Sequence, residues 1–391
     1  MAAEEQQDIW VSAFSVLVAH YSEQLVELRK ELGSVAVKYG IDSTEVKDVQ
    51  SRIAEVTAER DKAEAELVRV KERIAAGVTI IPGSVPPTLP PSKTPKKAKS
   101  IEPSKSAIKL IDASVEIMSN APEGEDMAFT HAVLCQVGLP RSKFEGREFM
   151  RQSGAAWINV QAGYLDEGNG PVQQPVPYGP LPRLALAWIS TQAVRTKDRE
   201  IAIGNSASEF LRLLGKPTTG GERGSFGSLR KQMHALAACR LQLGFKGRTY
   251  NGQPVEQFDA WLANKDTGQH ALWPGVMVLS DGYFSSLLES AVPLDNRALM
   301  ALSDSALALD VYTWLAHRLH RIEGRGVTIH WKALREQFAQ EYQGKDPDKD
   351  FKKKFLPALK KVLAVYPEAK VKPVTGGVLL LGSPPPIAYK G

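Results

Sequence analysis

The sequence predicts a mainly α protein with small β-wings, of the α+β class, in which two winged helix-turn-helix domains follow an antiparallel coiled-coil hairpin. Residues 178–245 read as a helix, a short strand, a second helix, a glycine-rich turn, a third helix and a second strand. A winged helix-turn-helix requires this order of elements. The same order returns roughly 120 residues later, and a heptad pattern near the N-terminus adds the hairpin.

The repeat can be followed by counting from two tryptophans, Trp188 and Trp314. Each is followed by arginine at the seventh and eleventh positions and by a β-branched residue at the thirteenth and fifteenth. The matching residues are Arg195, Arg199, Ile201 and Ile203 in the first copy, and Arg321, Arg325, Val327 and Ile329 in the second. Matches without a gap favour a duplicated domain. The alternative is that any junction between a helix and a strand favours such residues at these places.

Composition sets the broad class of the protein. The chain has 391 residues, of which 43% are hydrophobic and 24% charged, so two or three domains with real cores are expected. A net charge of only +5 does not by itself indicate a nucleic-acid partner. The two cysteines, Cys135 and Cys239, lie too far apart for a zinc motif or a disulfide framework, which suits a reducing cytoplasm. We expect no signal peptide, no membrane span, no metal and no cofactor.

Residues 1–76 are expected to form the helical hairpin. Apolar residues recur every three or four positions in its first half, and they alternate strictly by three and four in its second half. A period of 3.5 residues is typical of a coiled-coil seam. The second-half seam comprises Val46, Val49, Ile53, Val56, Arg60, Ala63, Leu67, Val70 and Ile74. We expect self-association through this hairpin; the alternative is a hairpin that packs only on itself or on the main domain.

Residues 77–106 form a linker rich in Pro, Ser and Lys, which cannot bury a core. Its five lysines against one glutamate allow either a nuclear address or an arm that follows DNA, or simply a soluble tether. The first winged-helix domain, with its lead-in, is expected over 107–290. Within the lead-in, 127–140 reads as an apolar helix carrying His131 and Cys135, and 155–179 as a β-hairpin with a turn at 168–170.

In the first copy, the third helix begins near Ser225 after a loop rich in glycine. The loop lacks the Gly-Lys-Ser/Thr ending of a phosphate-binding loop, so a nucleotide enzyme is poorly supported. One face of the helix is apolar and the other is polar, so the polar face is the candidate for DNA contact. The candidate residues are Ser225, Ser228, Arg230, Lys231 and His234. The alternative is a solvated charged face. Strands at 240–250 and 273–279, separated by a polar loop, are the expected wing.

The second copy covers 291–391, and its third helix is strongly basic. Over 345–372 there are nine lysines against four acids. Lysine is a point charge that suits phosphate better than base edges. The strand–turn–strand run after this helix, KVKPVTGGVLLLG, is the expected second wing. The candidate DNA-binding lysines are Lys349, Lys352, Lys353, Lys354, Lys360, Lys361, Lys370 and Lys372. A basic surface without a ligand is the alternative.

Several long segments resemble the plasmid-encoded RepA family of replication initiators, over about residues 107–390. The segments that carry the resemblance are DMAFTHAVLCQVGLPRSKFEGREF, QPVPYGPLPRLALAWISTQAVRT, EFLRLLG, GSLRKQMHALAACR and WPGVMVLSDGYF. The resemblance implies two winged-helix modules that bind repeated double-stranded sites at a plasmid origin. It also implies opening of the adjacent duplex and recruitment of the host helicase or initiator proteins, without chemistry by the initiator itself. The N-terminal hairpin does not match the core of that family.

We therefore expect a cytoplasmic bacterial DNA-binding protein that initiates plasmid replication. The first rival is a winged-helix transcriptional regulator or autorepressor of a plasmid operon. The second rival is an enzyme such as a nuclease or relaxase, which the sequence disfavours because it has no cluster of histidines or carboxylates and no tyrosine beside an HxH metal site.

Overall fold

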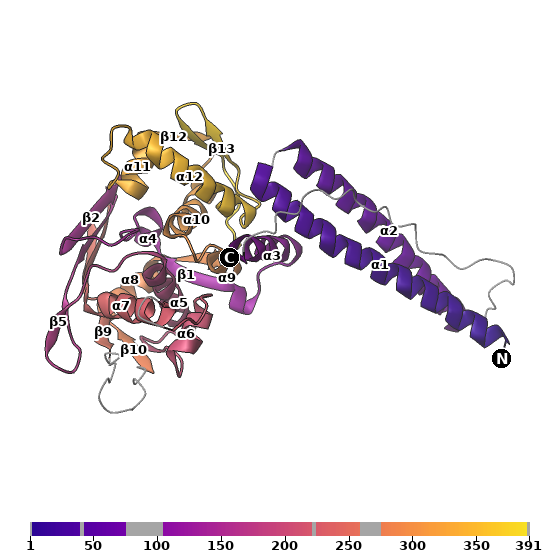
Figure 1. Ribbon diagram of the computed structural model, residues 1–391, viewed down its shortest axis with the longest axis horizontal. Helices are drawn as coiled ribbons and strands as arrows, with labels where there is room; N and C mark the ends of the chain where they lie inside the picture. Colours follow the sequence, from indigo (N-terminus) through magenta and orange to yellow (C-terminus); the bar gives the residue numbers. More distant parts are fainter. Residues whose placement is uncertain (1, 40–42, 76–104, 221–223, 259–274, 389–391) are drawn as a thin grey trace. The chain divides into compact units, whose positions relative to one another are not determined.

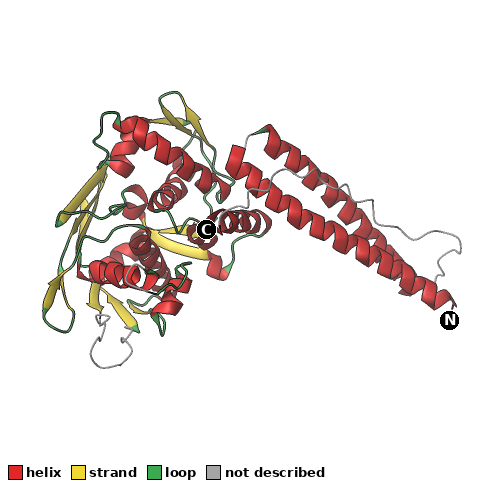
Figure 2. Ribbon diagram, viewed as in Figure 1, coloured by secondary structure: helices red, strands yellow, loops and turns green. Residues whose placement is uncertain are grey.

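The computed structural model describes residues 2–39, 43–75, 105–220, 224–258 and 275–388. Most of the predicted linker, and the loop between the expected wing strands of the first copy, lie outside these residues. The chain divides into two compact units, 1–115 and 116–391. Both units contain helices, and small separate antiparallel sheets rather than one continuous sheet occur in the second (Figure 2). The α+β class is confirmed; the predicted domain boundaries stay predictions.

The N-terminal unit begins with two long helices, α1 (Ala2–Tyr39) and α2 (Thr44–Ala75), in the order the heptad pattern predicts. Near the turn, Leu32 of α1 packs with Val46 and Val49 of α2 in a buried cluster. Arg52 donates two hydrogen bonds to the Glu31 carboxylate, at 2.8 and 3.1 Å, across the pair. Helices joined by so short a turn run antiparallel. Supercoiling of the pair remains a prediction.

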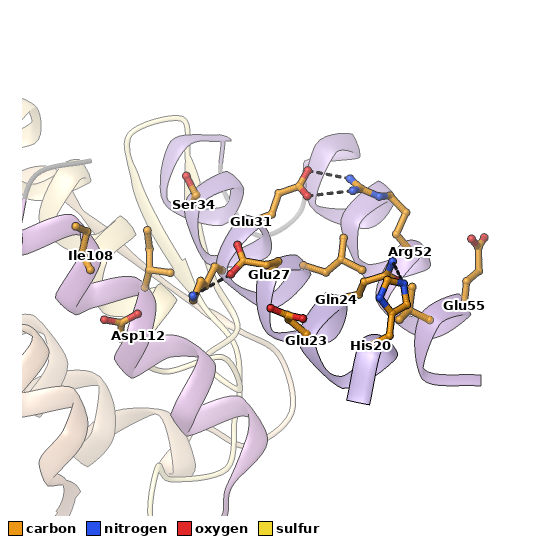
Figure 3. A pocket seen from close by; sticks show the side chains of 14 residues that line it. His20, Glu23, Gln24, Glu27, Glu31, Ser34, Arg52, Glu55, Ile108 and Asp112 are labelled. Atoms are coloured by element: carbon orange, nitrogen blue, oxygen red, sulfur yellow. Dashed lines mark hydrogen bonds and ion pairs between the residues drawn. The ribbon is translucent and has the colours of Figure 1, made fainter. Parts of the chain in front are cut away.

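A wide groove of about 1,090 Å³ lies within this unit, along α1 and α2 and beside α3 (Lys105–Ser119) (Figure 3). Its floor is apolar and includes Leu28, Val56 and Ile111. Carboxylates surround the floor, and two of them are already paired, Glu31 with Arg52 and Glu27 with Lys30 at 3.0 Å. The hairpin therefore has a large concave face in addition to its seam.

One expectation for the lead-in is wrong, because 127–140 is not a single helix. Residues Met127–His131 form strand β1, and only Ala132–Gln136 is helical, as α4. Strand β1 pairs antiparallel with β11 (Ala291–Asp295), a partner far away along the chain. The Thr191 hydroxyl also accepts a hydrogen bond from the Phe129 backbone at 2.8 Å. A distant partner strand overrides the local helical pattern, which no short window can reveal.

The wing expected at 240–250 is also wrong in its pairing. The two strands there form a hairpin, but they join a four-stranded sheet in the order β2-β3-β7-β8. These strands are β2 (Glu148–Ser153), β3 (Ala156–Gln161), β7 (Arg240–Phe245) and β8 (Arg248–Gly252). The expected hairpin at 155–179 is split: its first strand is β3, and only β4 (Tyr164–Asp166) and β5 (Pro171–Gln173) pair around the turn.

The first repeat contains a helix, a strand and two helices, followed by a pair of strands. They are α5 (Pro180–Thr196), β6 (Glu200–Ala202), α6 (Ala207–Leu213), α7 (Ser225–Ala238), β9 (Val255–Phe258) and β10 (Val276–Leu279). Ser206 caps α6 by accepting from the Glu209 backbone, as a serine at that position is expected to do. The strands form a small sheet in the order β6-β10-β9. Helix α8 (Asp281–Ser290) then leads through β11 to the short α9 (Asn296–Ala301).

The second repeat has the same order of elements, except that the β7–β8 hairpin, which stands between α7 and β9 in the first repeat, has no counterpart among its described elements. Its elements are α10 (Ala306–Arg318) with a 3-10 turn η2 (Leu319–Arg321), β12 (Val327–His330), α11 (Trp331–Ala339), α12 (Pro347–Ala364), β13 (Val371–Val374) and β14 (Gly377–Leu380). The sheet order β12-β14-β13 matches β6-β10-β9 strand for strand. The core contact also recurs, since Trp188 meets Phe210 edge-on at 5.2 Å and Trp314 meets Phe338 edge-on at 5.3 Å. Duplication thus extends from the sequence pattern to the packing.

Polar side chains fasten the two repeats together. Arg183 of α5 forms a buried ion pair with Asp310 of α10, with N–O distances of 2.6 and 2.8 Å, and also donates to three backbone carbonyls. A second connection joins β2, a strand of the four-stranded sheet, to the turn after α11, where the fully buried Arg151 side chain reaches Glu341 at 3.2 Å. Such buried charges keep a defined geometry because an unpaired charge in the interior is costly. The first helices of the two repeats, α5 and α10, are therefore tied to each other.

Candidate nucleic-acid interface

The third helix of the first repeat, α7, presents a mixed face to solvent. Leu229, Met233 and Leu236 are buried, as the apolar spacing predicts. Ser228 and Lys231 are exposed and Arg230 is half-buried. Lys231 also lies over the Tyr178 ring, 5.9 Å from its centroid. The exposed part of α7 therefore combines two cations and a hydroxyl near the N-terminus of the helix, where the backbone favours anions.

A pocket of about 430 Å³ lies beside the first turn of α7, between it and the start of α5. Ser225, Ser228 and Lys231 line it together with Lys216, which pairs with Asp304 at 2.7 Å. The Ser225 hydroxyl is engaged locally: it accepts from the Thr219 backbone at 2.7 Å and closes the preceding loop. Ser225 therefore shapes the entry to α7, and Ser228 is the more accessible of the two predicted serines.

The expectation that His234 lies on the exposed face of α7 is wrong. Its side chain is 2% exposed in the structure. The ring packs edge-on against Phe258 at 6.0 Å, and Nδ1 lies 3.1 Å from the Glu167 carboxylate. Burial is the main cause that lowers the pKa of His234, against the opposing effect of Glu167. Strand β9 and the β4–β5 hairpin thus cover a position that periodicity alone assigned to solvent.

The third helix of the second repeat, α12, has a continuous buried face and a dense lysine face. Phe351, Phe355 and Leu359 are buried, and Val362 takes the next buried position. The predicted lysines on the opposite face are exposed except for Lys361, which is half-buried: Lys349, Lys352, Lys353, Lys354, Lys360 and Lys361. Asp346 caps the helix by accepting from the Lys349 backbone.

Acids at the start of α12 are already paired. Asp348 accepts from Arg335 of α11 at 2.5 Å, and Asp350 accepts from Lys353 one turn along at 3.2 Å. These pairs reduce the repulsion that the acids would exert on a phosphate. Lys352 lies over the Trp331 ring, 5.2 Å from its centroid, and that ring packs edge-on against Phe355. The ring supports the Lys352 stem without removing its charge.

The hairpin β13–β14 lies where the sequence predicts a strand–turn–strand run, with Lys370 just before it and Lys372 on it. Both residues are exposed. The turn needs Gly376, whose φ of 85° lies in the left-handed region. Lys372 pairs opposite Leu379 in the register of the hairpin. The lysines of α12 and of the hairpin therefore belong to one repeat.

Three neighbouring residues around the start of α11 were not among the candidate DNA-binding residues. Trp331 is the first residue of the helix and supports Lys352. His330 and Lys332 flank it and are exposed. In helix-turn-helix proteins the helix before the recognition helix crosses the DNA backbone. The alternation of apolar and polar residues in Val327–His330 stops before Trp331, and this break was the signal in the sequence that a helix starts there.

Neither a metal site nor a membrane helix is present in the described part of the chain. Among these residues no three His, Cys, Asp or Glu side chains gather closely enough for a metal ion. None of the described helices has the length and apolarity to cross a bilayer. His131 and Cys135 are both buried, and burial lowers the pKa of His131 to about 4 and raises that of the Cys135 thiol. Both behave as core residues.

Comparison with known proteins gives one match. Residues 176–333 match the family model described as plasmid encoded RepA protein. The match extends from just before α5 into α11, so it covers the first repeat and the start of the second. No curated protein and no solved structure matches the chain. The resemblance drawn from the sequence is thereby confirmed over these residues.

Proposed function

We propose that this chain, which matches the model of the plasmid-encoded RepA family over residues 176–333, initiates plasmid replication by binding repeated double-stranded sites at the plasmid origin. The observation that carries the proposal is the recurrence of one arrangement. Twice, a helix, a strand and two helices precede a strand pair, and the sheets share one strand order. That arrangement supports two winged helix-turn-helix modules with α7 and α12 as their recognition helices (Figure 1).

The two recognition helices would make different contributions. The lysines of α12 and of its hairpin favour contacts with phosphates, which give affinity without reading sequence. On α7, Arg230 can make paired hydrogen bonds to a guanine edge, while Ser228 and Lys231 can contact the backbone. We infer that α12 anchors the protein and that α7 supplies more of the sequence discrimination.

Binding to DNA across a salt series tests the proposal. Fluorescence anisotropy would compare a duplex bearing one origin repeat with a scrambled duplex of equal length. If about six phosphates are contacted, the slope of log K against log salt is about −5 for B-DNA. We expect tighter binding to the repeat at every salt concentration. Equal, weak binding to both duplexes would mean that the lysine faces are only charged surface.

Opening of the adjacent duplex and recruitment of host helicase or initiator proteins complete the proposed activity, in the bacterial cytoplasm. A transcriptional repressor would bind the same repeats, so binding alone does not separate the two functions. A plasmid carrying the origin and this gene, introduced into a permissive host, does separate them. Autonomous replication that needs the gene supports the initiator, whereas repression without replication supports the regulator.

We further propose that the protein is not an enzyme. Incubation of supercoiled origin plasmid with the protein and Mg²⁺ should leave the plasmid supercoiled. Nicked or linear product that depends on the protein would overturn this part of the proposal.

The hairpin of α1 and α2 would let two chains associate. Val16 and Val68 are 52% and 49% exposed, and they lie at the same level of the antiparallel pair because the turn lies midway between them. Exposed apolar side chains on a long helix favour a second helix as partner. Light scattering of the full chain should give a dimer or larger, and V16S/V68S should shift it toward the monomer. A wild-type monomer at tens of micromolar would contradict self-association.

A further inference from the structure

A second pocket lies in the larger unit, separate from the predicted DNA-binding side chains. It has a volume of about 450 Å³, within the range typical of ligand sites. Residues of β1, α4, β7, β8, α8, β11, the end of α10 and the 3-10 turn η2 line it. Its apolar part includes Val133, Leu243, Val292 and the partly exposed ring of Phe245. Arg248 and Arg321 supply cationic groups to the same pocket.

The guanidinium of Arg321 is held by two imidazoles. Its Nη1 donates to His317 Nε2 at 2.6 Å, and its Nε donates to His320 Nε2 at 3.3 Å. His320 donates its other ring N–H, at Nδ1, to the Ala316 carbonyl at 3.0 Å, which leaves Nε2 as an acceptor. Both rings therefore act as neutral acceptors, in agreement with the lowered pKa of each, which is about 4 for His317.

Because both imidazoles are neutral, they do not offset the positive charge of Arg321. Among the described residues, no carboxylate lies within ion-pair distance of Arg321. Its counterpart in the first repeat, Arg195, meets the Glu125 carboxylate at 2.9 Å. The two repeats thus treat the same arginine differently. Both guanidinium groups are held in position by hydrogen bonds, but only that of Arg321 keeps its charge available for an external anion.

Two other polar groups of the pocket, His131 and Ser286, are hydrogen-bonded to each other. His131 accepts from the Val133 backbone through Nδ1 at 3.2 Å, so its Nε2 carries the proton and donates to the Ser286 hydroxyl at 3.0 Å. Ser286 is then left with its own proton to donate. Arg248 pairs with Glu289 at 3.2 Å on the rim, where both side chains are well exposed and the pair is weak.

We propose that this pocket binds an acidic peptide segment of a protein partner, with a carboxylate on Arg321 and an adjacent apolar side chain against Phe245, Leu243 and Val292. A guanidinium binds carboxylate and phosphate alike, in paired hydrogen bonds. The apolar half of the pocket distinguishes them, since a DNA phosphate brings no apolar group to cover. The pocket lies outside the proposed DNA contacts, so the two functions fail independently.

The test is anisotropy of fluorescein-labelled hexapeptide pools with full-length protein. One pool has a fixed Asp flanked by Leu, Val or Phe, and the matched pool has Asn in its place. We expect the Asp pool to bind and the Asn pool to bind about 10- to 100-fold more weakly, the range for a hydrogen bond to a charged group. R321Q should weaken the Asp pool by the same factor and leave the Asn pool unchanged.

Two controls identify the source of any signal. R325Q removes an equal charge from an exposed arginine that does not line the pocket, and it should leave binding of the Asp pool unchanged. Origin DNA binding by R321Q should equal that of the wild type. Absence of binding by the Asp pool up to millimolar protein would overturn the proposal, as would equal binding by R321Q. The labelled Asp pool could also be displaced by inorganic phosphate or duplex DNA and not by an excess of unlabelled, acetylated Asp peptide. That result would mean that the pocket binds phosphate instead.

Discussion

At the scale of single residues, the buried charges report how the larger unit is held together. Arg183 and Asp310 are 9% and 7% exposed, and removing one partner leaves the other charge unpaired in the interior. We expect Asp310→Ala to lower the free energy of unfolding by about 3–5 kcal/mol. At about 2–4 °C per kcal/mol for a unit of this size, the melting temperature should fall by roughly 6–20 °C.

A surface ion pair provides the comparison for this variant. Arg199 pairs with Glu256, but both side chains are about half exposed, at 42% and 54%. Glu256→Gln should change the free energy of unfolding by less than about 1 kcal/mol. Differential scanning fluorimetry of Asp310→Ala and Glu256→Gln measures the two shifts in melting temperature. Equal shifts would mean that the Arg183–Asp310 pair does not fasten α5 to α10 as the structure indicates.

Two buried histidines predict how stability depends on pH. Burial lowers the pKa of His131 and His317 from 6.5 to about 4, and for His317 the charges of Arg321, His320 and Arg318 act in the same direction. The unfolded chain therefore binds protons first as the pH falls. Each stabilising contribution is complete above about pH 6.5 and is lost between pH 6.5 and 4, up to about 3 kcal/mol apiece.

Urea unfolding at pH 7.5, 6 and 5 measures this dependence. The midpoint should fall steeply below pH 6.5 for the wild type, and His317→Gln should reduce that fall. His330→Gln is the matched control, because its ring is exposed at the start of α11. A midpoint that rises on acidification would contradict the burial of these imidazoles.

At the scale of elements, α12 should provide the larger electrostatic part of DNA binding. Replacing Lys352, Lys353 and Lys354 by Gln removes three exposed cations from one helix face. If each contacts a phosphate, the salt slope should become less negative by about 2.7, at about 0.9 per contact. Binding measured at several salt concentrations gives the slope directly.

The control triple variant removes the same charge from the hairpin of α1 and α2. Lys47, Lys62 and Lys71 are exposed on α2. Replacing them by Gln should leave the slope for origin DNA unchanged. A similar change from both triple variants would show that net charge, and not the face of α12, determines affinity.

Helices and their buried faces were readable from the sequence wherever a strong period of three or four existed. The third helices α7 and α12 and the hairpin β13–β14 lie where the pattern predicts them. Strand pairing was not readable, because β1 and β7 are fixed by partners more than 75 residues away. The burial of His234 was not readable for the same reason, since the side chains that cover it, Glu167 and Phe258, come from other elements of the chain. Local periodicity places a residue on a helix face, but distant segments decide which faces are covered.

At the scale of the whole larger unit, the buried ties between the repeats predict a fixed spacing of DNA contacts. Because the Arg183–Asp310 pair holds the first helices of the two repeats together, we expect that α7 and α12 cannot rotate freely about each other. Inserting about five base pairs within one origin repeat turns one half-site by half a helical turn. We expect affinity to fall toward the level of a single half-site. Gel-shift titration of spaced duplexes tests this, and affinity independent of spacing would mean that the repeats move separately.

The most direct test of the central claim is a hydroxyl-radical and methylation footprint of the full-length protein on one origin repeat. Two protected segments are predicted within the repeat, one for each third helix. Arg230→Gln should remove protection of guanines in one segment, and the Lys352, Lys353 and Lys354 triple variant should weaken backbone protection in the other. A single protected segment, or two segments that both disappear with either variant, would contradict a protein that reads DNA through two modules.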